Sequence, residues 1–177
     1  MTRHAPPRHL SRRAALQVLY AADLGAKAIA ADATPMEDVF ERVATHFDLH
    51  AGARSFAWDL VAGVEAERGA LDRCIAEHAR NWRVDRMAAV DRNVLRLAAF
   101  ELLYTDTPRS VVLNEAVELA RDFGADRSPS FVNGVLDAIA EDSQSRRFGE
   151  GAEAEAGAAG GAPAEREDAS PGSDLES

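Results

Sequence analysis

Apolar residues recur at helical spacing from about residue 9 to about residue 142, and no segment shows the alternation of a half-buried strand. Seven helices are predicted. The second begins at residue 34, and the others cover residues about 9–24, 52–67, 69–80, 86–104, 109–122 and 128–141. The segment 86–104 is apolar nearly all round, which is typical of a central helix wrapped by others. The pattern therefore predicts an all-α fold, a compact bundle of about seven helices.

Two of the predicted helices begin at recognisable capping sequences. Thr34 is a candidate N-cap, Pro35 suits the first helical turn, and Glu37 completes a capping box. Ser128 followed by Pro129 has the same combination of a cap and a first-turn proline. These signals place the starts of the second and seventh helices.

The composition changes abruptly after Phe148, where Ala, Gly, Glu, Pro and Ser dominate and Leu175 is the one large apolar residue. Such a segment cannot bury enough apolar surface to offset the entropy of ordering it. We therefore divide the chain into a basic N-terminal arm (1–8), a helical domain (9–142) and a disordered acidic C-terminal tail (143–177).

The net charge of −10 is distributed unevenly. Residues 150–177 hold eight acidic residues and one arginine, whereas residues 1–13 hold four arginines and no acid. Basic arms commonly contact nucleic acid.

Arg8, Arg12 and Arg13 flank the start of the first helix, and Tyr20 follows two turns later. Cations beside an aromatic ring suit single-stranded RNA, whose phosphates need neutralising and whose bases stack. The alternative is a solvated terminus with Tyr20 in the core.

Two acids fall inside apolar stripes. Asp23 lies between Leu19 and Tyr20 on the helical wheel, and Glu101 is placed similarly in the fifth helix. An unpaired buried carboxylate is costly, so an arginine or a helix N-terminus must meet each acid. Arg92 and Arg96 form a ridge that could meet such acids or face RNA, and the sequence leaves both options open.

The last helix has an aromatic residue beside small ones. Phe131 lies at the margin of the buried stripe, and Gly134 and Ala138 continue its edge. This arrangement suits a flat docking surface for another protein or, equally, tight packing within the fold.

Motifs for catalysis are absent: the sequence has no Gly-rich phosphate loop, no HExxH and no G-x-S-x-G. Cys74 is the only cysteine, and no acid or cysteine completes a metal site around the histidines. No apolar run is long enough to span a membrane, and no secretory signal follows the N-terminus. We expect a cytoplasmic protein that is not an enzyme and needs no cofactor or metal.

Four segments, RRAALQVLYAADL (12–24), VDRNVLRLAAFEL (90–102), LNEAVELARDFGA (113–125) and SFVNGVLD (130–137), resemble the NusB family in the right order. The resemblance covers roughly residues 8–142. It implies an all-α fold in two packed subdomains, and a factor that binds the boxA element of ribosomal-RNA leader transcripts together with NusE, a ribosomal small-subunit protein. The complex would load on RNA polymerase and suppress premature termination.

The resemblance also implies roles for individual residues. The family's RNA-binding positions fall on the arm, on an aromatic of the first helix and on the fifth helix: Arg8, Arg12, Arg13, Tyr20, Arg92 and Arg96. The edge facing NusE would include the turn before the last helix and the start of that helix: Asp126, Arg127, Phe131 and Gly134.

Two alternatives remain at this point. The same fold serves as the RNA-binding module of ribosomal-RNA cytosine methyltransferases, although the catalytic domain that such an enzyme needs is not expected in this chain. The other alternative is a homodimer in which the RNA site is masked.

Overall fold

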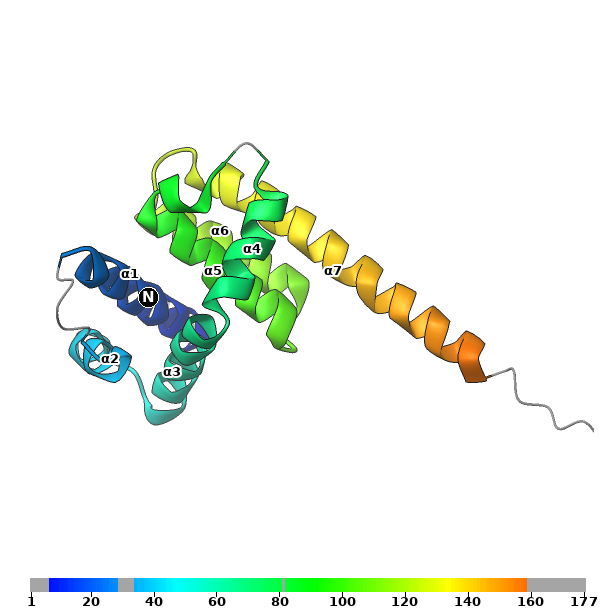
Figure 1. The fold of residues 1–177 in the computed structure, drawn as a ribbon. Coiled ribbons are helices and arrows are strands. Elements are labelled where there is room, and N and C mark those ends of the chain that lie inside the picture. Colours follow the sequence, from blue (N-terminus) through cyan, green and yellow to red (C-terminus); the bar gives the residue numbers. More distant parts are fainter. Residues whose placement is uncertain (1–6, 29–33, 81, 159–177) are drawn as a thin grey trace, which may run out of the picture. The chain divides into compact units, whose positions relative to one another are not determined.

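The computed structural model describes residues 7–28, 34–80 and 82–158, and all regular structure within them is helical (Figure 1). The helices are α1 (Pro7–Ala28), α2 (Met36–Ala44), α3 (Ala51–Ala66), α4 (Arg68–His78), a 3₁₀ turn η1 (Val84–Arg86), α5 (Ala89–Tyr104), α6 (Arg109–Phe123) and α7 (Ser128–Ala158). The predicted all-α fold is confirmed. None of the helices in the described part of the chain is long and apolar enough to cross a membrane.

The starts of two helices differ from their predicted caps. Helix α2 begins at Met36 with Pro35 at the N-cap and no side-chain cap, so the predicted capping by Thr34 is wrong. Thr34 lies one residue too early, because Pro35 already occupies the extended N-cap position. Ser128 is the first residue of α7, and its hydroxyl accepts a hydrogen bond from the backbone N–H of Ala125 in the preceding turn.

Helix α7 continues well beyond its predicted end near residue 141. Glu and Ala favour helix, and extending an existing helix costs far less than starting one. Contacts divide the chain into two units, residues 1–143 and 144–177. Within the second unit the described backbone is helical to Ala158, and residues 1–6 of the predicted arm and 159–177 of the predicted tail lie outside the described residues.

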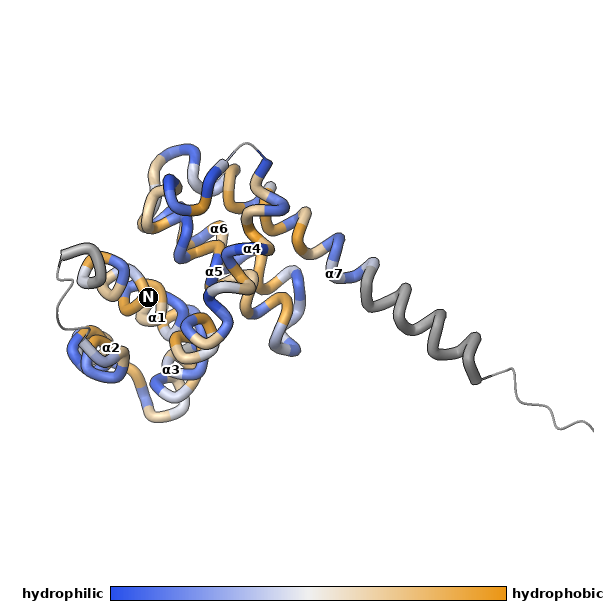
Figure 2. The backbone as a smooth tube through the Cα atoms, viewed as in Figure 1, coloured by the Kyte–Doolittle hydropathy of each residue, from blue (hydrophilic) through white to orange (hydrophobic). Residues whose placement is uncertain are grey.

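Helix α5 is the centre of the first unit, as its sequence predicted. Every residue from Arg92 to Ala99 is buried, and the helix packs against α1, α3, α4 and α6. Gly63 of α3 lies so close to it that a Cβ there would come within 2.1 Å of the Phe100 ring. Peripheral helices are amphipathic instead: Figure 2 shows apolar residues on one side of α2 and hydrophilic residues on the other.

Helices α1 and α5 run antiparallel, and ion pairs join them at both ends. Arg12, near the start of α1, meets Glu101, near the end of α5. Asp23, in the later part of α1, meets Arg92, near the start of α5. Two pairs of opposite polarity fix the register of these helices, because sliding one along the other would separate both.

Candidate nucleic-acid and partner interface

Arg12 is a structural residue of the core. It is 3% exposed, and its Nε and Nη2 atoms donate to Glu101 Oε1 and Oε2 at 2.8 and 2.7 Å. Burial acts to lower the pKa of Arg12, but the hydrogen bonds and charge of Glu101 outweigh it and raise the pKa further. The sequence analysis predicted that Arg12 contacts RNA. The structure instead buries its guanidinium, which neutralises the Glu101 carboxylate and is shielded from solvent.

The other arginines at the start of α1 lie at the surface. Arg8 is exposed, with its guanidinium carbon 3.9 Å from the centroid of the Phe56 ring. Arg13 is partly exposed, lies 4.8 Å from the Phe123 ring centroid and pairs with Asp122. Stacking on aromatic rings holds both guanidinium groups in place while leaving them accessible.

Tyr20 is also at the surface, 37% exposed, and is therefore not the core residue that the alternative interpretation required. It lies three positions before Asp23, so the two side chains are neighbours on α1.

Asp23 is paired with arginines, one of the two kinds of partner that its position in the apolar stripe predicted. It is 5% exposed, and its Oδ2 accepts hydrogen bonds from Arg92 Nη2 at 2.8 Å and from Asn93 Nδ2 at 3.1 Å. Arg96 Nη1 lies 3.4 Å from the same oxygen, and Arg68 donates to Oδ1. Burial acts to raise the pKa of Asp23, but these hydrogen bonds and positive charges outweigh it and hold the pKa below its ordinary value.

Arg92 and Arg96 therefore form ion pairs inside the fold. Both are buried, and Arg96 also donates to the two oxygens of Asp72 at 2.7 and 2.8 Å. Of the two options that the sequence left open for this ridge, the structure favours the one in which the arginines pair with acids.

Of the predicted partner-facing residues, Asp126, Arg127 and Phe131 line a pocket of about 510 Å³ between the region before α5 and the start of α7. It is lined by Trp82, Met87, Ala88, Asp91, Ala125, Asp126, Arg127, Ser128, Ser130 and Phe131. Phe131 is half-buried, and its ring centroid lies 5.2 Å from that of Trp82. Gly134 is exposed, and a Cβ there would meet no atom of the described residues within 4 Å.

Two residues of this pocket escaped the sequence analysis. Asp91 Oδ1 is buried without a hydrogen-bond partner among the described residues, and it adjoins the Phe131 pocket. Trp82 is 57% exposed and lies between α4 and η1, outside any helical stripe. A tryptophan in a short polar connection is the only sequence signal that could have drawn attention to it.

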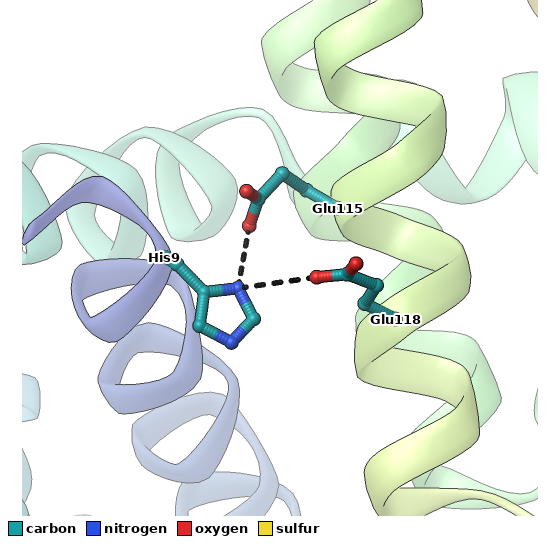
Figure 3. A group of neighbouring side chains, drawn as sticks. All are labelled: His9, Glu115 and Glu118. Atoms are coloured by element: carbon teal, nitrogen blue, oxygen red, sulfur yellow. Dashed lines mark hydrogen bonds and ion pairs between the residues drawn. The ribbon is translucent and has the colours of Figure 1, made fainter. Parts of the chain in front are cut away.

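His9, Glu115 and Glu118 come together between α1 and α6 (Figure 3). His9 Nδ1 lies 2.8 Å from Glu115 Oε2 and 3.8 Å from Glu118 Oε2. One nitrogen and two carboxylates could hold a divalent cation, but Arg12 Nη1, 3.8 Å from Glu115 Oε2, already places a positive charge there. We assign the group as a polar contact, through His9 Nδ1 and Glu115 Oε2, that holds the start of α1 on α6.

The fold and its exposed cationic and aromatic side chains define a small helical binding protein. Residues 9–141 match the model of the NusB family. A transcription antitermination protein NusB of Geotalea uraniireducens is 46% identical over 142 residues, covering 75% of this chain and 93% of the relative. The corresponding protein of Anaeromyxobacter dehalogenans is 45% identical over 141 residues, covering 79% and 94%. The chain belongs to the NusB family.

Solved structures agree with this assignment. NusB of T. maritima superposes with a TM-score of 0.68 at 31% identity, over 78% of this chain and 93% of that chain. A crystal structure of antitermination factors NusB and NusE in complex with dsRNA contains a chain that is 28% identical, with a TM-score of 0.68, over 80% of this chain and 99% of that chain.

Proposed function

We propose that this protein is a transcription antitermination factor that binds boxA RNA of ribosomal-RNA leader transcripts together with NusE. Bound to RNA polymerase, the complex suppresses premature termination. The observation that carries the proposal is a structural similarity. This protein matches a chain from a crystal structure of NusB and NusE with dsRNA, over nearly the full length of that chain. In this proposal the protein acts in the cytoplasm, needs no cofactor and catalyses no reaction.

The RNA contacts at the start of α1 are assigned to Arg8, Arg13 and Tyr20, whose side chains are accessible. Guanidinium groups already stacked on Phe56 and Phe123 lose little freedom when they bind phosphate. Arg12 supports this surface from beneath by fixing α1 on α5.

A salt titration tests these contacts. Arg8→Ala and Arg13→Ala should each flatten the slope of log affinity against log salt by about 0.7, because each removes one phosphate contact on single-stranded RNA. Binding of a boxA oligoribonucleotide would be measured by fluorescence anisotropy between low and moderate salt. Arg54→Ala, an arginine on α3 paired with Glu41, is the matched control. A double variant that keeps the wild-type slope would overturn the assignment.

The NusE surface is assigned to the pocket beside Phe131, which Asp126 and Arg127 also line, and to Gly134, which is exposed one turn further along α7. Phe131→Ala should cost roughly 2 kcal/mol or more in NusE affinity, as truncation of a central aromatic anchor does. Isothermal titration with purified NusE measures this loss.

A denaturant melt of the same variant separates docking from packing. Because Phe131 is only half-buried, the free energy of unfolding should fall by clearly less than the ~3–5 kcal/mol expected for a core phenylalanine. Full NusE affinity combined with a core-sized stability loss would show that Phe131 serves packing alone.

A further inference from the structure

A second cleft, of about 690 Å³, opens beside the Asp23 cluster, between α4, η1 and the start of α5. Its lining is rich in charge, with five arginines and three aspartates: Arg68, Arg73, Arg83, Arg92, Arg96, Asp23, Asp72 and Asp85. Trp82 completes one side of it. The lining therefore carries an excess of positive charge next to a large aromatic ring.

The charges in this cleft are not all satisfied by one another. Arg92 and Arg96 are buried against Asp23 and Asp72. Arg73 is exposed and makes no hydrogen bond or ion pair with the described residues. Among the residues that the structure describes, Arg83 pairs only with Asp85, two residues away, and both side chains are well exposed. Exposed pairs of this kind contribute little, so Arg83 is free to exchange its partner for another anion.

Trp82 lines both this cleft and the Phe131 pocket. Contact with Phe131 supports the indole on one side, while more than half of the side chain stays accessible. A supported but exposed indole is suited to accept a flat ligand, because little conformational entropy is lost when a second ring stacks on it.

We propose that this cleft binds a nucleotide of the same RNA strand, with the base stacked on Trp82 and the adjoining phosphates at Arg73 and Arg83. Single-stranded RNA is the occupant that matches both features, since it presents bases to aromatic rings and phosphates to guanidinium groups together. Tyr20 neighbours Asp23 on α1, so an RNA strand lying on Tyr20 is already next to the cleft. This inference rests on the proposed RNA-binding function.

Fluorescence tests the stacking directly, because Trp58 and Trp82 are the only tryptophans in the chain. Trp58 lies on α3 against Phe40, away from the cleft lining, and provides the matched control. A Trp58→Phe variant reports on Trp82 alone, and a Trp82→Phe variant reports on Trp58 alone. A boxA oligoribonucleotide, titrated without NusE because Trp82 also lines the Phe131 pocket, should quench Trp82 emission saturably and leave Trp58 emission unchanged.

Affinity measurements complete the test. Trp82→Ala should weaken RNA binding about tenfold, and Trp82→Phe should retain most of the affinity because a phenyl ring still stacks. Arg73→Gln and Arg83→Gln should each flatten the salt slope by about 0.7, while Arg54→Gln leaves it unchanged. Far-UV circular dichroism checks that each variant is folded.

The possible outcomes separate this inference from the proposed function. If the wild-type protein binds RNA while Trp82 emission and the slopes of the Arg73 and Arg83 variants stay unchanged, the cleft is not an RNA site and the proposed function stands. If the wild-type protein binds no RNA, the proposed function itself fails. If a poly-glutamate peptide quenches Trp82 emission at lower concentrations than the RNA does, the cleft is a protein-binding site and the inference is overturned.

Discussion

Helix α1 carries two buried ion-pair centres that look alike in sequence but differ in their surroundings. Near its start, Arg12 donates two hydrogen bonds to Glu101, both residues are buried, and Glu115 lies 3.8 Å from the same guanidinium. In its later part, Asp23 is shared by Arg68, Arg92 and Arg96, next to an open cleft. The first centre only joins helices, whereas the second leaves an excess of positive charge at a surface where a ligand can reach it.

The number of partners decides what each centre loses when one member is removed. Glu101 is hydrogen-bonded to one buried guanidinium, that of Arg12. Removing Arg12 therefore leaves the buried negative charge of Glu101 without its hydrogen-bonded positive partner. Asp23 belongs to a network that water from the adjoining cleft can reach, and Asp72 still binds Arg96 when Asp23 is changed. The Arg12–Glu101 centre should therefore be the more sensitive one.

The largest effect is expected for Arg12→Ala, which strands the Glu101 carboxylate in the core. Its free energy of unfolding, measured in urea, should fall by about 3–5 kcal/mol. Combining Arg12→Met with Glu101→Leu removes both charges at similar volume and should recover most of that loss. If Arg12→Ala unfolds at the same urea concentration as the wild-type protein, the Arg12–Glu101 pair contributes nothing to the stability of the fold.

Asp23→Asn should have a smaller effect, about 1.5–3 kcal/mol, as expected for lost hydrogen bonds to a charged group. The amide can still accept one hydrogen bond from Arg92, and the cleft admits water to the arginines. Equilibrium unfolding of Asp23→Asn and Arg12→Ala under the same conditions tests the comparison. An equal or larger loss for Asp23→Asn would reverse the ranking of the two centres.

The two centres also show how far sequence reasoning reaches. A carboxylate inside an apolar stripe needs a partner, so it was predictable from residue positions that Asp23 and Glu101 would each meet an arginine or a helix N-terminus. Which arginine pairs with each acid was not predictable, because a helical wheel shows one helix without its neighbours. Ser11 and Arg12 are buried because α1 packs against α3 and α5 together, which makes its buried face wider than its apolar stripe.

The surface clefts were harder to predict than the helices. Periodicity identified α5 as central because burial on all sides leaves a clear apolar signature. Trp82, Arg73 and Arg83 form no periodic pattern, and they share one cleft only because α4, η1 and α5 fold together. Phe131 was predictable because an aromatic residue at the margin of a buried stripe, beside Gly134 and Ala138, suits a docking surface.

Acid should weaken the Asp23 centre. The folded protein holds the pKa of Asp23 below its ordinary value, so the centre's contribution to stability is complete above the unfolded pKa of about 3.9 and is lost as the pH falls through the lower, folded pKa. Thermal melts of the wild-type protein should therefore show a loss of stability below about pH 4 that Asp23→Asn shows to a smaller extent. Parallel pH profiles for the two proteins would contradict this assignment.

The smallest stability effect is expected for Arg68→Ala. Arg68 binds Asp23 Oδ1, but its side chain is 37% exposed, whereas Arg92 holds Oδ2 from within the core. An exposed partner contributes about 0.2–1 kcal/mol, so urea unfolding should barely change. Because Arg68 also lines the cleft beside Trp82, its loss lowers the positive charge there, and the same variant should still weaken RNA binding. A stability loss as large as that of Asp23→Asn, with RNA binding intact, would mean that the Asp23 centre resembles the Glu101 pair and that its arginines serve the fold alone.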